Sequence, residues 1–247
     1  MLPVTVIALS DRLGWRSGLL ICGIVGVALA LVLYAQTAGI GEARRSAGRA
    51  TGDEARSAQV LLSVPVVLCF VYFALLSVAL VGIQTFLPPT LGALYGMPIA
   101  LATAALTGFL LGASAGVVCG GVIADRGRRH DLVVIAGLAV AGGLVLALAL
   151  VDGGPAVTLG LTSAAGFASG ITMPSRDMLV RAAAPVGATG RVFGFVYSGL
   201  DLGSSLTPPT MGFLIDSGAP RGVFFIVVAA LLLAIVSVLV LWRLARK

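Results

Sequence analysis

The sequence predicts an all-α membrane protein, and three observations lead to that class. The chain has 247 residues, of which 59% are apolar and only 11% are charged, whereas an ordinary soluble domain has about 25% charged residues. The mean hydropathy is +1.10. Residues 57–124 form 68 successive positions without a charge. Because a crossing of the bilayer needs roughly 20 apolar residues, this stretch holds at least two. Soluble enzymes, nucleic-acid-binding proteins and disordered tails are therefore excluded.

Charged residues, prolines and glycines divide the apolar sequence into seven predicted crossings. Backbone groups in lipid must be satisfied within their own segment, and the strict alternation of short barrel strands is absent, so the crossings are helices. Residues 1–10 are apolar but too short to cross, and they resemble the end of a helix whose beginning is missing. The predicted helices are 18–35, 60–86, 98–124, 132–151, 153–175, 192–215 and 222–242, with the long uncharged run broken at 87–89 and near 96–98.

The arginines indicate how these helices are oriented. Positive charges concentrate in cytoplasmic loops, and one face collects 13 basic residues while the other has only Arg12, Arg16 and Arg221. We therefore expect the start of the chain outside and the C-terminus in the cytoplasm. The 13 are Arg44, Arg45, Arg49, Arg56, Arg126, Arg128, Arg129, Arg176, Arg181, Arg191, Arg243, Arg246 and Lys247.

Several scarce residue types narrow the chemistry. His130 is the single histidine and Lys247 the single lysine, so neither a histidine-built metal centre nor a buried Schiff-base lysine is expected. The cysteines lie in apolar runs and are expected to be packed thiols. No phosphate-binding loop or catalytic constellation is visible, so we expect no cofactor and no enzymatic activity. The excess of arginine over lysine, with abundant alanine and glycine, favours a GC-rich bacterial gene and the bacterial inner membrane.

Residues 60–242 contain an internal similarity at a constant offset of 91 positions. The string GVIADRG at 121–127 corresponds to GFLIDSG at 212–218. The two copies end helices that are three crossings apart, so they point in opposite directions across the bilayer. This pattern predicts an inverted three-plus-three repeat, which is a feature of secondary transporters.

Glycines follow the same repeat. They recur at every fourth residue of one helix and at corresponding places in its counterpart. The absence of side chains there lets a neighbouring helix approach closely, either as static packing or as a surface that slides during gating. These predicted packing positions are Gly108, Gly112, Gly116, Gly120, Gly199 and Gly203.

A loop motif carries a family resemblance. The segment from Gly121 through Asp125 and Arg126 to Arg128 and Arg129 resembles the G-x-x-x-D-R/K-x-G-R/K-R/K loop of the major facilitator superfamily. The spacing differs, because Gly127 follows Arg126 directly. The stretches 14–16 and 190–194 are similar to the same superfamily. From the residues themselves, Asp125 can pair with Arg126 or Arg129, or accept from a neighbouring helix N-terminus. Such a gating latch would bias two conformations; the alternative is a loop that sets topology only.

The resemblance implies a specific architecture. The family has twelve helices in two bundles, and this chain is similar to the part from the end of the fifth helix through the twelfth. Residues 1–35 would then be a remnant of the N-terminal bundle, 36–58 the cytoplasmic central linker, and 59–247 the six-helix C-terminal bundle. The implied function is secondary active transport of a small solute by alternating access, as a symporter or antiporter. The implied partner is the missing N-terminal bundle or a second copy.

Two other functional classes fit the helix count. One is a seven-helix receptor or sensor, although no retinal lysine, extracellular cysteine pair or signalling domain is visible. The other is a small sugar facilitator built on parallel three-helix repeats, whereas the repeat found here is inverted.

One acid marks a possible site. Asp201 is the tenth of 24 residues in the run 192–215, roughly 13 Å along a helix and so near the membrane centre. A charge there costs at least about 2.5–3.5 kcal/mol on insertion scales, so it should face protein or water. Gly199 and Gly203 fall on the opposite side of the helix. We expect Asp201 to bind a proton or substrate, or to serve as a structural acid, with Gln84, Tyr72 and Tyr197 as weaker substrate contacts.

Overall fold

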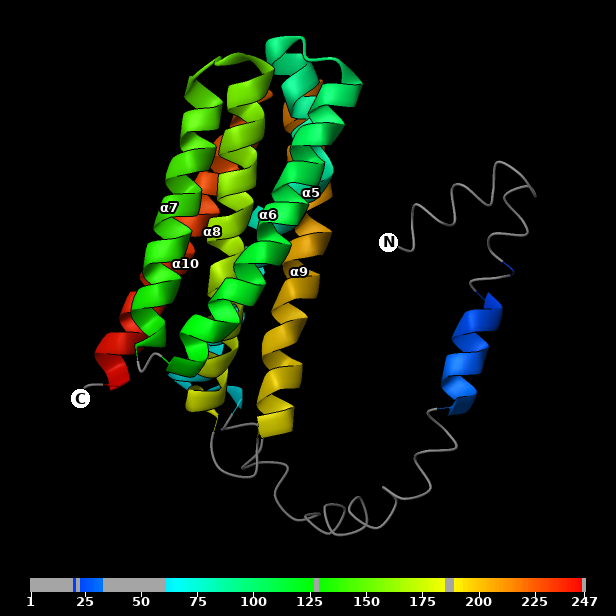
Figure 1. Ribbon diagram of the computed structural model, residues 1–247. Helices are drawn as coiled ribbons and strands as arrows, with labels where there is room; N and C mark the ends of the chain where they lie inside the picture. Colours follow the sequence, from blue (N-terminus) through cyan, green and yellow to red (C-terminus); the bar gives the residue numbers. More distant parts are fainter. Residues whose placement is uncertain (1–19, 21–22, 33–60, 127–128, 185–188, 246–247) are drawn as a thin grey trace. The chain divides into compact units, whose positions relative to one another are not determined.

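The computed structural model describes residues 20, 23–32, 61–126, 129–184 and 189–245 (Figure 1). The chain divides into two compact units, residues 1–54 and residues 55–247. In the first unit the described helix covers Gly23–Val32, within the predicted crossing at 18–35. The rest of the predicted N-terminal remnant and the predicted linker at 36–58 lie outside the described residues.

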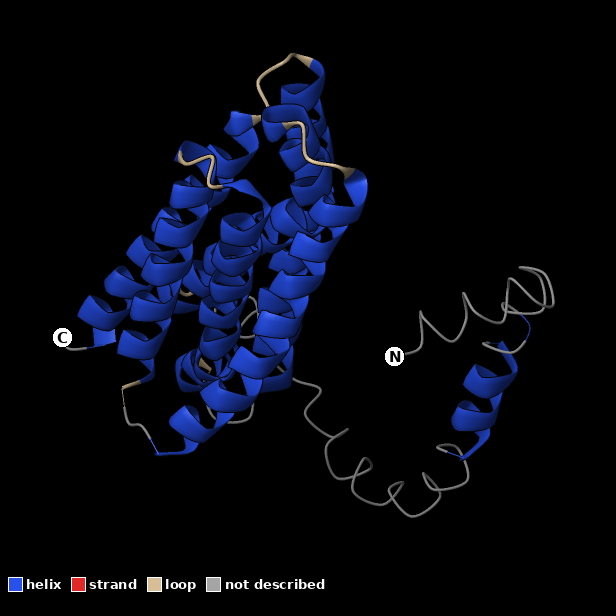
Figure 2. Ribbon diagram, turned by 45° about the horizontal axis from the view of Figure 1, so that its top comes forward, coloured by secondary structure: helices blue, strands red, loops and turns tan. Residues whose placement is uncertain are grey.

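The second unit is an all-α bundle, which confirms the predicted fold class; no strand occurs in its described residues (Figure 2). Its connections alternate between the two ends of the bundle, so successive helices are antiparallel (Figure 1). Every helix except α9 is long and apolar enough to cross a membrane. The helices are α5 (Val64–Tyr95), α6 (Ile99–Arg126), α7 (His130–Leu150), α8 (Gly154–Ala183), α9 (Thr189–Asp216) and α10 (Arg221–Ala245).

The predicted break at 87–89 is wrong, because α5 continues through Pro88 and Pro89 to Tyr95. Each proline deprives the carbonyl four residues earlier of its helical partner, here the carbonyls of Gln84 and Thr85. Membrane helices tolerate such prolines where neighbouring helices, hydroxyl side chains or water satisfy the freed carbonyls, and both residues are exposed on the described bundle. The helix ends instead at Gly96, whose φ of 61° is left-handed and whose N–H donates to the Gly92 carbonyl at 3.0 Å.

The fifth predicted crossing, at 153–175, is too short. Helix α8 passes through Pro174 and ends at Ala183, about two turns beyond the expected end. Arg176 and Arg181, which the arginine distribution assigns to a loop, therefore lie inside the helix. Their position reduces the number of loop arginines on the predicted cytoplasmic face but leaves the bias toward that face intact.

The helix contacts follow the repeat. The second helix of each half packs on the first helix of the other half, α6 on α8 and α9 on α5, and these are the two most extensive contacts. The third helices do the same, since α7 packs on α8 and α10 on α5, while α7 and α10 meet each other. Each main contact thus has a counterpart in which every helix is replaced by the corresponding helix of the other half. The corresponding helices α6 and α9 run in opposite directions (Figure 1).

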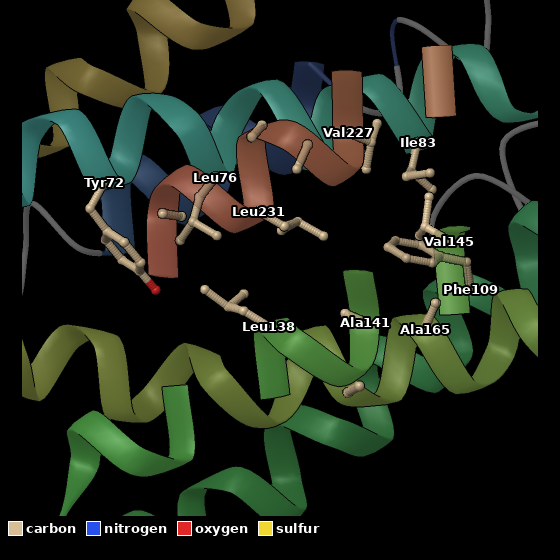
Figure 3. Packing of buried hydrophobic residues seen from close by; sticks show 14 of the residues in the cluster. Tyr72, Leu76, Ile83, Phe109, Leu138, Ala141, Val145, Ala165, Val227 and Leu231 are labelled. Atoms are coloured by element: carbon tan, nitrogen blue, oxygen red, sulfur yellow. The ribbon is translucent and has the colours of Figure 1, made fainter. Parts of the chain in front are cut away.

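Apolar side chains fill the space between α5, α7, α8 and α10 (Figure 3). Phe73 and Leu87 of α5, Leu138 of α7 and Phe224 of α10 are essentially inaccessible. Helix α9 takes little part in this core beyond the face that it presents to α5. The other side of α9 is left to carry polar groups.

Glycines determine how closely α6 approaches α8. A Cβ atom added at Gly112 would collide with the Ser163 carbonyl oxygen, and one added at Gly116 would lie 3.0 Å from the Ile171 nitrogen. The fit is reciprocal, because a Cβ at Gly170 of α8 would lie 2.9 Å from the Ala113 carbonyl carbon. Gly108 and Gly120 face α8 in the same way, meeting Ser163 and Ile171.

Candidate functional site

Helix α9 has two contrasting faces. Gly199 and Gly203 are buried against α5, where added Cβ atoms would lie 2.5 Å from the Phe70 carbonyl oxygen and 2.7 Å from the Ser77 Cβ. Ser77 also donates to the Leu200 carbonyl at 2.6 Å. Asp201 lies on the exposed side. One face thus fixes α9 to α5 and leaves the other accessible.

Hydroxyl groups surround the backbone of Asp201. Ser204 and Ser205 donate to its carbonyl oxygen at 2.9 and 2.8 Å. These bonds direct the two hydroxyls to their own helix, so they do not bind the carboxylate in this conformation. The exposed face of α9 therefore presents an acid flanked by small polar side chains, which can accept a proton or bind a cation or hydrogen-bond donor.

The other predicted substrate contacts occupy different environments. Gln84 is exposed on α5. Tyr72 is only 3% exposed, and its hydroxyl points into the bundle interior (Figure 3). Among the described residues that hydroxyl has no hydrogen-bond partner. Tyr197 lies on the exposed side of α9 and donates to Asp177 Oδ1 at 3.3 Å. The structure therefore does not gather these four side chains into one site.

A charged cluster that the sequence analysis missed joins three helices. Arg176 Nε donates to Asp177 Oδ1 at 3.1 Å, and its guanidinium carbon lies 4.9 Å from the centre of the Phe73 ring of α5. The Arg176 side chain is 12% exposed and Asp177 42%. Arg176 also lines an interior cavity together with Leu76 and Leu138. The signal in the sequence is the pair of adjacent opposite charges at 176 and 177, followed by three apolar residues. That pattern indicates that the helix continues and carries both charges.

The predicted gating motif lies at the end of α6 that is joined to α7. Asp125 and Arg126 are exposed in its last turn, Arg129 precedes α7, and Arg128 lies outside the described residues. Within the described stretches 61–126 and 129–184, the ion pair present joins Arg176 to Asp177 rather than Asp125 to an arginine. A Cβ atom added at Gly121 would meet no neighbouring element within 4 Å. The latch at Asp125 stays a prediction.

This geometry defines a class of protein: a helical membrane bundle with an inverted repeat, glycine-packed helix pairs and one helix that carries polar groups on its free face. The family model of the major facilitator superfamily matches residues 1–175 and 83–247. The chain therefore belongs to the major facilitator superfamily, whose members are membrane transporters of small solutes and not enzymes. No curated protein matches the chain significantly.

Proposed function

We propose that this chain moves a small solute across the bacterial inner membrane by secondary active transport, using alternating access. The observation that carries the proposal is the two-faced helix α9: glycines fix one side to α5, and the other exposes Asp201 beside serine side chains. An acid at that depth is costly unless it faces protein or water. It is therefore expected where a solute or proton passes.

The proposed transport unit needs a second wall. The exposed face of α9 lines only one side of a pathway, and alternating access requires a second bundle that moves against the first. We propose that another six-helix bundle, from an N-terminal region or from a second copy of the chain, supplies it. The polar contact that Asp125 of the gating motif makes would be formed in one conformation and broken in the other.

Proton-coupled flux is the direct test. We expect inside-out vesicles from a transport-deficient host that expresses the full chain to acidify or alkalinise when one solute of a broad panel is added. A pH-sensitive dye measures this change, and vesicles from cells with the empty vector are the control. A solute that raises the thermal unfolding midpoint of the chain but drives no flux would instead favour the receptor or sensor alternative.

Orientation is testable at the two ends of α9. We propose that Thr189 faces the cytoplasm and Ser217 the outside, because the basic loops mark the cytoplasmic face. After replacement of Cys22, Cys69 and Cys119 by alanine, Ser217→Cys should react with an impermeant maleimide in intact cells. Thr189→Cys should react only after permeabilisation. Labelling of Thr189→Cys in intact cells would overturn the orientation.

A further inference from the structure

Helices α8 and α9 touch each other very little, although a short connection joins them. Each is fixed to other helices: α8 to α6 and α7, and α9 to α5. One polar contact that crosses from α9 to α8 is the hydrogen bond from the Tyr197 hydroxyl to Asp177 Oδ1, at 3.3 Å. This bond therefore links two helices that packing alone leaves nearly independent.

The acceptor of this bond, the Asp177 carboxylate, is held in place by Arg176. Arg176 lies over the Phe73 ring and donates to the same carboxylate oxygen of Asp177, at 3.1 Å. An arginine stacked on an aromatic ring and paired with a carboxylate keeps both contacts through its planar guanidinium. Because Arg176 is mostly buried while Asp177 is partly exposed, the arginine positions the carboxylate at the surface that α9 approaches.

The donor is positioned by the same aromatic group. The Tyr197 ring centre lies 5.1 Å from that of Phe73 and 5.8 Å from that of Phe193. Phe73 thus contacts both Arg176 of α8 and Tyr197 of α9. The contact with Phe73 holds this part of α9 against α5, whereas Phe193 belongs to α9 itself and orients the Tyr197 ring. The hydrogen bond to Asp177 joins the Tyr197 hydroxyl to α8.

The contact lies toward one end of the bundle. Asp177 is six residues before the end of α8 and Tyr197 eight residues after the start of α9, about 9–12 Å along each helix. This is the end at which α8 and α9 are connected. Separation of the helices there would open a path beside α9 without disturbing its glycine contacts with α5.

We propose that the Asp177–Tyr197 hydrogen bond is a releasable tie between α8 and α9, and that Arg176 is a positioning residue for it. The inference rests on the proposed transport function, in which the bundle alternates between conformations. A single bond between partly exposed groups has a modest net strength. Its loss should therefore shift the balance between closed and open arrangements without unfolding the bundle.

The distance between the two helix ends tests the tie. In the cysteine-free background, spin labels at Arg181→Cys on α8 and Gly194→Cys on α9 report that distance by pulsed electron resonance in lipid nanodiscs. Tyr197→Phe removes the hydroxyl and keeps the ring. We expect the ratio of long to short distances to rise about fivefold, equivalent to roughly 1 kcal/mol. Asp177→Ala should act similarly, and the double variant should add little.

A matched control separates the tie from a general loss of packing. Tyr95→Phe also deletes one phenol hydroxyl of an interhelical bond, to the Leu148 carbonyl at 2.7 Å, but it joins α5 to α7. It should leave the α8–α9 distances unchanged. An unchanged distribution in Tyr197→Phe, or additive effects of the Tyr197 and Asp177 variants, would overturn the tie.

Solute flux measured on the same variants separates this inference from the proposed function. Flux by the parent chain with an unaltered Tyr197→Phe distribution would refute the tie alone. A shifted distribution in a chain that moves no solute would refute transport and leave the tie standing.

Discussion

Replacement of Gly116 by alanine should destabilise the bundle by about 2 kcal/mol, within the 1–3 kcal/mol typical of overpacking. The added Cβ would lie 3.0 Å from the Phe167 carbonyl carbon and collide with the carbonyl oxygen of the same residue. The obstacle is backbone, which no side-chain rotation can move. Helices α6 and α8 would have to separate along the most extensive contact in the bundle. Unfolding of the purified chain by SDS titration in mixed micelles measures the change.

Gly121→Ala is the matched control for this prediction. Gly121 lies on the same helix, but an added Cβ there would meet nothing within 4 Å. Because alanine is favoured over glycine in a helix by roughly 0.5–1 kcal/mol, this variant should match the parent or exceed its stability slightly. Equal stabilities of Gly116→Ala and Gly121→Ala would show that the α6–α8 interface tolerates a wider separation.

Asp201→Asn should reduce proton-coupled uptake at least about tenfold, equivalent to roughly 1.4 kcal/mol in the transition state for transport. The amide has nearly the shape of the carboxylate but cannot exchange a proton. Protein level should be unchanged, since Asp201 is exposed and its carbonyl contacts with Ser204 and Ser205 do not involve the carboxylate. Uptake of the solute identified in the vesicle assay, measured with and without a pH gradient, tests this expectation.

Two comparisons make the Asp201 experiment specific. Asp216→Asn changes an exposed acid at the end of the same helix and should transport like the parent. Solute exchange without net proton movement should survive in Asp201→Asn if the residue carries only the proton, and should be lost if it also binds the solute. Uptake equal to that of the parent in every assay would exclude both roles.

The lipid bilayer, as the solvent of these helices, explains how much of the fold the sequence determined. A bilayer leaves no alternative to helices for apolar segments of this length, so the class, the number of bundle helices and most of their bounds followed from composition. The end of α5 at Gly96 followed from local chemistry, because a glycine that can adopt the left-handed conformation, followed two residues later by Pro98, stops a helix. The offset of 91 residues indicated two related halves, and the helix contacts are exchanged between those halves.

Two element ends depended on tertiary structure. The proline pair at Pro88 and Pro89 stops a helix in water, but in this bundle α5 continues through both and packs against α9 and α10. Likewise α8 continues past Pro174 to Ala183. Helix propensity describes a segment alone, whereas the neighbours of that segment decide whether the backbone hydrogen bonds lost at a proline are tolerated.

The sequence by itself determined the membrane class, the inverted pattern and the polar face around Asp201, since these depend on composition, on a constant offset along the chain and on spacing within one helix. Only the tertiary structure decided that Arg176 is inside a helix, that Tyr72 points into the core, and that Asp177 meets Tyr197. Helical periodicity gives the face on which a side chain lies, but the rotation and partner of each helix are set by packing with segments far away in the chain.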